Sequence, residues 1–133
     1  MIKEIIYPAI FEIDKDGAIT ITFPDLPSAI SCADNTRDAY HYATEVAELV
    51  LENYIDDLFE NAPKPSELKS IHLEKNQCIA LIKIDTEKVI RESSSKSIKK
   101  TVTIPSWLNE IGIKNNLNFS KILQDGIKKE LGI

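Results

Sequence analysis

Apolar and polar positions alternate along the first part of the chain. Residues 5–13 form a mostly apolar run, and residues 18–23 alternate between large apolar side chains and threonine or alanine. Because the side chains of a strand point alternately to opposite faces, both stretches predict β-strands. The Asp16-Gly17 pair between them is typical of a tight hairpin turn. The chain is therefore predicted to open with a hairpin.

A third strand and a long helix are predicted next. Residues 29–33 follow a proline-rich break and form a short apolar strand. Thr36 is the predicted N-cap of a helix that runs to about Phe59. Its buried face is predicted from apolar residues at helical spacing: Ala39, Ala43, Val46, Ala47, Val50 and Tyr54.

The segment after this helix predicts two more strands, residues 71–73 and 78–84, and a short helix over residues 85–92. The second strand is almost wholly apolar, so we expect it to be central or covered on both faces. We expect Cys32 and Cys78 to be buried free thiols within strands.

The pattern changes near residue 93. Four serines among residues 93–97 predict a flexible linker, because serine-rich segments cannot pack a core. The next six residues, 99–104, alternate again and predict one strand, which Pro105 ends. Two amphipathic helices follow, and the second begins at Asn118 or Ser120, both of which are good N-caps.

About 35 residues are too few to bury a core, and one strand has no partner among them. We therefore expect two copies of residues 99–133 to pair their strands and share an apolar core. The residues predicted for this dimer core are Val102, Ile104, Trp107, Leu108, Ile111, Phe119, Ile122, Leu123 and Ile127.

The charges divide along the same boundary. The chain has 133 residues and a net charge of −5, but residues 1–92 carry nine basic and eighteen acidic side chains. Residues 93–133 carry seven lysines and three acids. An acidic part and a basic part indicate two partners, a basic protein for the first and a polyanion for the second.

The strand over residues 99–104 has a face suited to DNA. Lys99, Thr101 and Thr103 share the face that must be exposed when Val102 and Ile104 are buried. A two-stranded ribbon fits the major groove, where lysine and threonine can contact base edges. The second helix adds free N–H groups at its N-terminus, a seat for a phosphate. The residues predicted there are Asn118, Phe119, Ser120 and Lys121.

These motifs together resemble one family. The segments TVTIPSWL and LNFSKILQDGIKKEL resemble a ribbon-helix-helix domain. The segment from YPAIFEIDKDG through FPDLP to the helix beginning DNT resembles the N-terminal part of HicB-type antitoxins. The resemblance covers nearly the whole chain, although threonines stand where ribbon domains often have arginine or asparagine.

The resemblance implies a partial ribonuclease-H-like domain over residues 1–92, a serine-rich linker over 93–98 and a ribbon-helix-helix domain over 99–133. The fold class expected is α+β, a β-β-β-α-β sheet backed by one long helix and then the ribbon-helix-helix module. The function implied is an antitoxin that blocks a HicA-type ribonuclease toxin. It would also bind its own operator DNA as a homodimer or a higher oligomer.

The position of the toxin contact is open from the sequence. Glu45, Glu48 and Glu52 lie on the polar face of the long helix and are the candidates for contact with a basic toxin, although such a ridge also occurs as a simple solvated face.

Alternatives remain at this point. A repressor that senses a small molecule through its N-terminal domain would have the same DNA-binding residues. A ribbon-helix-helix tail that only dimerises is a second alternative, which predicts that Lys99 and Thr101 are dispensable for DNA binding. The resemblance to ribonuclease H also raises the question of nuclease activity.

We expect no catalytic residue, no metal and no cofactor. The carboxylates near predicted strand ends are Glu12, Asp25, Asp34 and Asp85, and nothing in their spacing singles them out. His41 and His72 lie far apart without metal-site spacing. With neither a signal peptide nor an apolar run long enough to span a bilayer, we expect a cytoplasmic protein with no membrane partner.

Overall fold

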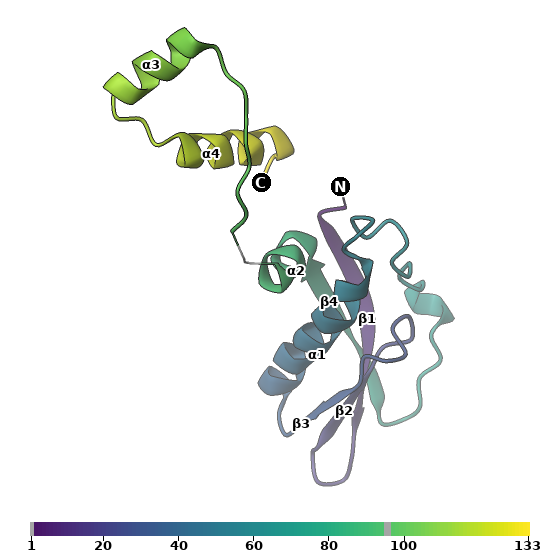
Figure 1. Ribbon diagram of the computed structural model, residues 1–133. Coiled ribbons are helices and arrows are strands. Elements are labelled where there is room, and N and C mark those ends of the chain that lie inside the picture. Colours follow the sequence, from purple (N-terminus) through teal and green to yellow (C-terminus); the bar gives the residue numbers. More distant parts are fainter. Residues whose placement is uncertain (1, 95–96) are drawn as a thin grey trace. The chain divides into compact units, whose positions relative to one another are not determined.

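A computed structural model of the chain describes residues 2–94 and 97–133 (Figure 1). The chain divides into two compact units, residues 1–96 and 97–133, which we call the body and the tail. The predicted linker, residues 93–98, begins inside a helix that includes Ser93, and its residues 95 and 96 lie outside the described residues.

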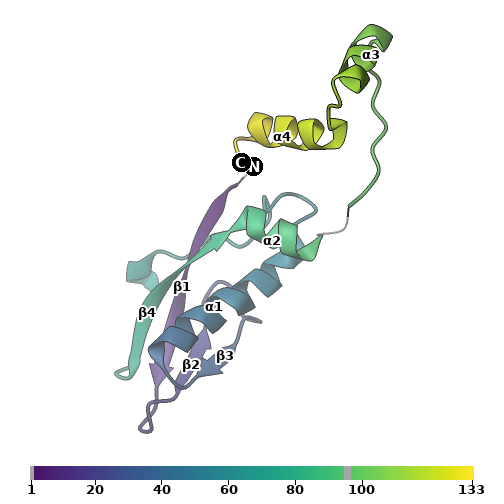
Figure 2. The same cartoon turned by 90° about the vertical axis from the view of Figure 1, so that its left-hand side faces the viewer.

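The body is a four-stranded antiparallel sheet with helices on one face. The strands are β1 (Glu4–Ile13), β2 (Ile19–Thr22), β3 (Ser31–Ala33) and β4 (Gln77–Asp85), in the order β3-β2-β1-β4 (Figure 2). The predicted hairpin joins β1 to β2. The Asp14 Oδ1 atom accepts from the N–H groups of Asp16 and Ala18, both at 2.9 Å, and Gly17 supplies the positive φ of 86° that the turn needs.

β4 corrects one prediction. Its near-continuous apolar run predicted a central or doubly covered strand, but β4 is an edge strand paired only with β1 among the described residues. Its side chains are instead alternately buried and exposed along the strand. Ile82 is fully buried, whereas its neighbour Leu81 is 51% exposed.

The long helix is α1 (Thr36–Leu51), and it differs from prediction at both ends. Its N-cap is Asn35 rather than Thr36, because the Asn35 Oδ1 atom accepts from the Asp38 N–H at 2.8 Å. The helix ends at Leu51, and the short 3-10 helix η1 (Glu52–Tyr54) follows. It cannot reach Phe59, because Leu58 and Phe59 have positive φ angles of 53° and 67°.

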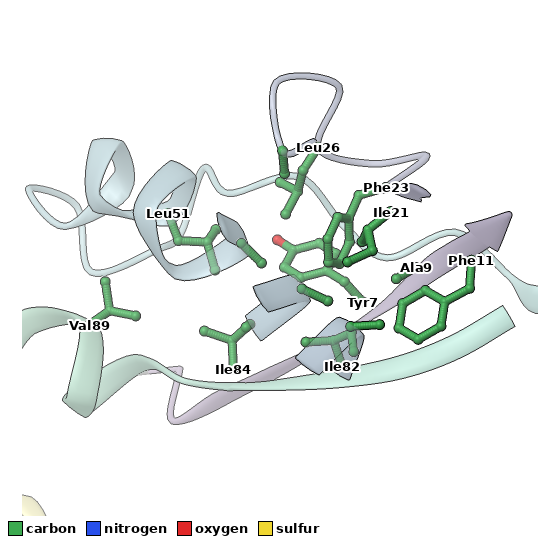
Figure 3. Close-up of a cluster of buried hydrophobic side chains, with 14 of the residues drawn as sticks. Tyr7, Ala9, Phe11, Ile21, Phe23, Leu26, Leu51, Ile82, Ile84 and Val89 are labelled. Atoms are coloured by element: carbon green, nitrogen blue, oxygen red, sulfur yellow. The ribbon is translucent and has the colours of Figure 1, made fainter. Parts of the chain in front are cut away.

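The core lies between α1 and the sheet (Figure 3). Tyr7 and Ile82 face each other in the register of β1 and β4, and both are fully buried, as is Leu51 of α1. The predicted helix stripe is confirmed in Ala39, Ala43 and Ala47, which are fully buried; Val46, Val50 and Tyr54 are partly buried against the core. Small alanines let the helix lie close to the sheet.

The segment between η1 and β4 contains no strand, so the prediction of one over residues 71–73 is wrong. It holds the 3-10 helix η2 (Leu68–Ser70) and otherwise follows an irregular path. Two contacts fix its first part. The Tyr7 hydroxyl donates to the Pro63 carbonyl at 2.6 Å, and Asp25 accepts from the N–H of Ser66 at 2.9 Å and from its hydroxyl at 2.5 Å.

A second helix, α2 (Thr86–Ser93), follows β4 as predicted. Asp85 caps it by accepting from the N–H groups of Glu87 and Lys88. Val89 of α2 is buried in the body core. Both cysteines are free but exposed, so the prediction that they are buried is wrong, because Cys32 and Cys78 fall on uncovered parts of short or edge strands.

The tail consists of an irregular segment over residues 97–105, then α3 (Ser106–Lys114) and α4 (Phe119–Leu131). The predicted strand over residues 99–104 is not formed in the single chain, where no described segment pairs with it. Asn118 caps α4, as predicted. The turn before it places Asn116 at a φ of 54°, a conformation that asparagine tolerates better than most residues.

Candidate interaction surfaces

The tail has almost no interior of its own. Gly112 is the only buried residue in the described tail, and large apolar side chains remain exposed, including Trp107 at 62% and Ile122 at 51%. One apolar groove runs between the extended segment, α3 and α4. Its lining residues are Lys100, Val102, Ile104, Leu108, Asn109, Ile111, Gly112, Leu117, Phe119, Ser120, Ile122 and Leu123.

This groove gathers most of the residues predicted for a dimer core. Trp107 and Ile127 of that set lie outside its lining and are exposed. Sequence reasoning missed Leu117 and Gly112. Leu117 stands alone between asparagines in a predicted turn, so helical periodicity gave no reason to bury it.

Gly112 fixes how α3 meets α4. Its carbonyl accepts from the Leu117 N–H at 3.1 Å, which closes the turn. A Cβ atom at position 112 would lie 2.6 Å from the Phe119 ring. A side chain at position 112 would therefore force the Phe119 ring to turn or α4 to shift, and Phe119 is the first residue of α4.

The N-terminus of α4 is only partly capped. The Asn118 Oδ1 atom accepts from the Lys121 N–H at 3.0 Å. The N–H groups of Phe119 and Ser120 precede the first residue that can bond within the helix, so they are free for an anion. Lys121 belongs to the first turn of α4, and its ammonium pairs with the Asp125 carboxylate at 2.7 Å, one turn further along the helix.

The other predicted DNA-contacting residues lie in the extended segment before α3. Lys99, Thr101 and Thr103 are all exposed.

On the body, α1 and α2 border a second groove with several carboxylates. Its lining residues are Arg37, Tyr40, His41, Thr44, Glu45, Glu48, Leu49, Glu52, Lys88 and Glu92. Glu45 on α1 and Glu52 at the start of η1 are exposed, as predicted. The exposed side chains of Tyr40 and Leu49 add apolar surface to the same groove.

Glu48 was predicted on the exposed face of α1, and that prediction is wrong. Its side chain is buried, and its Oε1 atom accepts from the Lys88 ammonium at 3.0 Å. This hydrogen bond raises the pKa of Lys88 above its ordinary value, with further contributions from the nearby charges of Glu48, Glu92 and Asp85 and against the effect of burial. Sequence reasoning missed Lys88 because tertiary packing, rather than spacing along the chain, brings α2 against α1.

The four carboxylates considered for a metal site have separate partners or positions. Asp25 holds Ser66, Asp85 caps α2, and Glu12 accepts from the Gln77 side chain at 2.9 Å. Asp34 precedes the cap of α1. Within residues 2–94 and 97–133, no group of three or more His, Cys, Asp or Glu side chains is placed to hold a metal ion.

Comparison with known proteins decides the family. The family model for the HicB-like antitoxin of bacterial toxin–antitoxin systems matches residues 7–117, which extend from β1 in the body to the turn before α4 in the tail. The chain belongs to this family of antitoxins. The resemblance to HicB-type antitoxins is thereby confirmed.

Two solved structures resemble the antitoxin over nearly its whole length. One is a chain of a toxin–antitoxin complex from Streptococcus pneumoniae, 27% identical, with a TM-score of 0.58, covering 96% of this chain and 99% of that one. The other is the antitoxin HicB of Burkholderia pseudomallei, 16% identical, with a TM-score of 0.44 and coverage of 96% and 97%. No curated protein sequence matches the antitoxin. None of its described helices is long and apolar enough to span a membrane.

Proposed function

We propose that this antitoxin binds and blocks a HicA-type ribonuclease through its body, and represses its own operon by binding operator DNA through its tail. Residues 1–92 would be the toxin-binding domain, and residues 99–133 would be a ribbon-helix-helix domain. Residues 93–98 would link the two domains. The observation that carries the DNA-binding half is the tail's exposed apolar groove, which a single chain leaves unfilled.

A second copy of the tail would fill that groove. Residues 99–104 of two chains would pair as an antiparallel ribbon, which places Val102 and Ile104 inside. Both residues line the groove in the single chain, next to Leu108, Ile111 and Ile122. Pairing would give the backbone N–H and C=O groups of residues 99–104 hydrogen-bond partners in the second strand. The same pairing would bury apolar side chains, so both effects would stabilise the dimer.

The paired ribbon would present Lys99, Thr101 and Thr103 of each chain to the major groove. The capped end of α4 would receive a backbone phosphate on the free N–H groups of Phe119 and Ser120. Lys121 would add a charge there, and the phosphate would compete with Asp125 for its ammonium. Operator DNA is therefore the polyanion that the basic tail would bind.

The toxin would contact the groove between α1 and α2. Glu45 on α1 and Glu52 at the start of η1 would offer exposed carboxylates, and Glu48 would act by holding Lys88 in place rather than by direct contact. The similar pneumococcal chain comes from a toxin–antitoxin complex, which supports a toxin as the partner. Binding without chemistry explains the function, so we propose no enzymatic role.

A gel-shift titration against the DNA upstream of the operon tests the tail. Lys99→Ala should weaken binding to all sequences and lower the slope of log K against log salt by about two, because the paired tails carry two copies of Lys99. Thr101→Ala should cost about 1–3 kcal/mol on the operator alone. Lys69→Ala, which removes an exposed lysine of the body, is the control and should change neither. Unchanged binding in both tail variants would favour a tail that only dimerises.

Co-expression with the product of the neighbouring reading frame tests the body. The double variant Glu45→Lys and Glu52→Lys should release a small basic toxin, while Glu74→Lys, an exposed acid in the turn before β4, should retain it. If the parent chain and both variants retained the toxin equally, the toxin would have to contact another surface of the antitoxin.

A further inference from the structure

One positive charge is fixed inside the groove between α1 and α2. The groove lining has four carboxylates, and the Lys88 ammonium of α2 lies among them. The Glu48 carboxylate holds this ammonium at 3.0 Å and is nearly buried itself, with 11% of its side chain exposed. The Lys88 side chain remains 51% exposed. α2 lies beside α1 (Figure 2), so the packing of the two helices sets the position of this charge.

The Lys88 ammonium has hydrogen-bond donors that the body does not use. An ammonium carries three N–H donors. Among the described residues, Glu48 is its one hydrogen-bond partner, because the Glu92 carboxylate lies 3.9 Å away, beyond hydrogen-bond distance. A partner that covers this groove would remove water from the remaining donors. It must therefore supply an acceptor to Lys88, because buried donors without an acceptor weaken a complex.

The surrounding side chains limit what this acceptor can be. Glu45, Glu52 and Glu92 line the same groove, so they would repel a carboxylate brought by the partner. A backbone carbonyl carries only a partial charge and meets far less repulsion. The three carboxylates also need cations opposite them. Tyr40 and Leu49, which are 48% and 62% exposed, add an apolar contact beside them.

We propose that the groove receives the C-terminal end of a helix of the toxin, whose last carbonyls accept from Lys88. This inference rests on the proposed function, since it takes the toxin as the partner and this groove as its site. The last carbonyls of a helix have no partner within the helix, and lysine or arginine is favoured in its last turn. Those basic side chains would face Glu45, Glu52 and Glu92. Lys88 thus selects which part of a basic toxin binds.

Photo-cross-linking of the full chain to the purified product of the neighbouring reading frame tests the orientation. With Tyr40 replaced by p-benzoylphenylalanine, mass spectrometry should locate the cross-link in the last turn of a toxin helix, close to lysine or arginine. The same replacement at Leu68, an exposed position in η2, is the control and should yield little product.

The other outcomes of this experiment are distinguishable. A cross-link from position 40 to a strand, a loop or the first turn of a helix would overturn the inference and keep the groove as the toxin site. A stable complex without that cross-link would overturn the groove and the inference together. Failure to form any complex would overturn the proposed toxin binding itself.

A charge-neutral pair of substitutions tests the role of Lys88. The double variant Glu48→Met and Lys88→Met keeps the net charge of the groove but removes the donors, so we expect about 10- to 100-fold weaker toxin binding. Glu67→Met with Lys69→Met removes an exposed ion pair in and beside η2 and is the matched control, expected to bind as the parent does. Equal affinity of the two double variants would overturn the proposal, because charge alone would then explain binding.

A single substitution gives an opposite sign for the two explanations. Lys88→Met makes the groove more negative, so attraction by carboxylates alone predicts tighter binding of a basic toxin. The need for a donor predicts weaker binding, with recovery in Lys88→Arg, which keeps both the charge and N–H donors. The tyrosine near-UV signal reports whether each variant body is folded. Tighter binding by folded Lys88→Met would overturn the proposal.

Discussion

The body and the tail use the same local devices but differ in where they find a core. In the body, Tyr7, Leu51 and Ile82 are fully buried between the helix and the sheet of one chain. In the tail, α4 has a side-chain cap in Asn118 and α3 begins after Pro105, yet Gly112 is the only buried residue of the described tail and Ile122 is half exposed. Caps and periodicity therefore define helices in both units, but only the body has enough chain to bury them.

The difference extends to charge. Residues 1–92 have twice as many acidic as basic side chains, and residues 93–133 have the opposite balance. Each unit would repel the partner proposed for the other, because the acidic body disfavours a nucleic acid and the basic tail disfavours a basic toxin. One chain can therefore hold two partners on separate surfaces.

The largest effect is expected when an apolar core side chain is shortened to alanine. Unfolding of the body and of the tail can then be measured by separate spectroscopic signals. The chain carries its single tryptophan, Trp107, in the tail and its four tyrosines in the body, so tryptophan fluorescence and tyrosine near-UV signals report on each unit. Leu51→Ala should lower the free energy of unfolding of the body by about 2–5 kcal/mol. The tyrosine midpoint should not depend on protein concentration, because the body core lies within one chain.

Ile122→Ala is the partner variant in the tail. It should lower the tryptophan midpoint, and that midpoint should rise with protein concentration, since the tail core is shared between copies. A tryptophan transition independent of concentration would break the comparison, because the tail would then fold without a second chain.

The sequence predicted local structure well and tertiary surroundings less well. The hairpin at Gly17 and the cap at Asn118 follow from short-range chemistry, and both are present. The end of α1 was misplaced, because the left-handed conformations of Leu58 and Phe59 have no glycine to signal them. The strand expected over residues 71–73 was wrong because the alternating triplet Ile71-His72-Leu73 is shorter than the four to eight residues over which alternation indicates a strand.

The candidate surfaces divide in the same way. The apolar stripe of α4 predicted most of the tail groove, because one helix face sets it. The burial of Glu48 could not be predicted, because its partner Lys88 is forty residues away and meets it only when α2 packs on α1. The exposure of Cys78 depends on the place of β4 at the sheet edge, which the strand's own sequence does not encode.

A smaller effect is expected at the one buried residue of the described tail. Gly112→Ala places a methyl group 2.6 Å from the Phe119 ring, so α4 must shift or the ring must turn. We expect a loss of about 1–3 kcal/mol in the tail transition, as for other overpacked sites, with no change in the tyrosine signal of the body. Weaker operator binding should accompany it, because Phe119 begins α4.

Gly126→Ala is the control for that substitution. Within one chain, a Cβ at position 126 meets nothing within 4 Å, so helix propensity predicts a gain of about 0.5–1 kcal/mol. A loss there equal to that of Gly112→Ala would indicate that a second tail packs against Gly126. The role assigned to the Gly112 contact would fail if Gly112→Ala were as stable as the parent chain.

A further effect is expected at alkaline pH, and it should be seen in the body, which holds Tyr7. Burial, together with the charges of Asp25 and Tyr54, raises the pKa of Tyr7 from 10.0 to about 12. The folded state therefore resists an ionisation that the unfolded chain undergoes readily. The stability due to neutral Tyr7 is complete below pH 10 and is lost as the pH rises toward 12. The pKa of Lys88 is also raised, so its ion pair with Glu48 likewise contributes stability that is lost as the pH rises above the ordinary pKa of lysine.

Tyr7→Phe separates the two contributions. At neutral pH it should cost about 1 kcal/mol, because the hydrogen bond to the Pro63 carbonyl is lost. Between pH 10 and about 12 its urea-unfolding free energy should fall less steeply than that of the parent chain, and the remaining slope belongs in part to Lys88. Lys88→Met is the complementary variant, which keeps the Tyr7 contribution and removes the other. If the unfolding free energy of Tyr7→Phe fell with pH as steeply as that of the parent chain, ionisation of Tyr7 would not be the cause of the alkaline loss of stability.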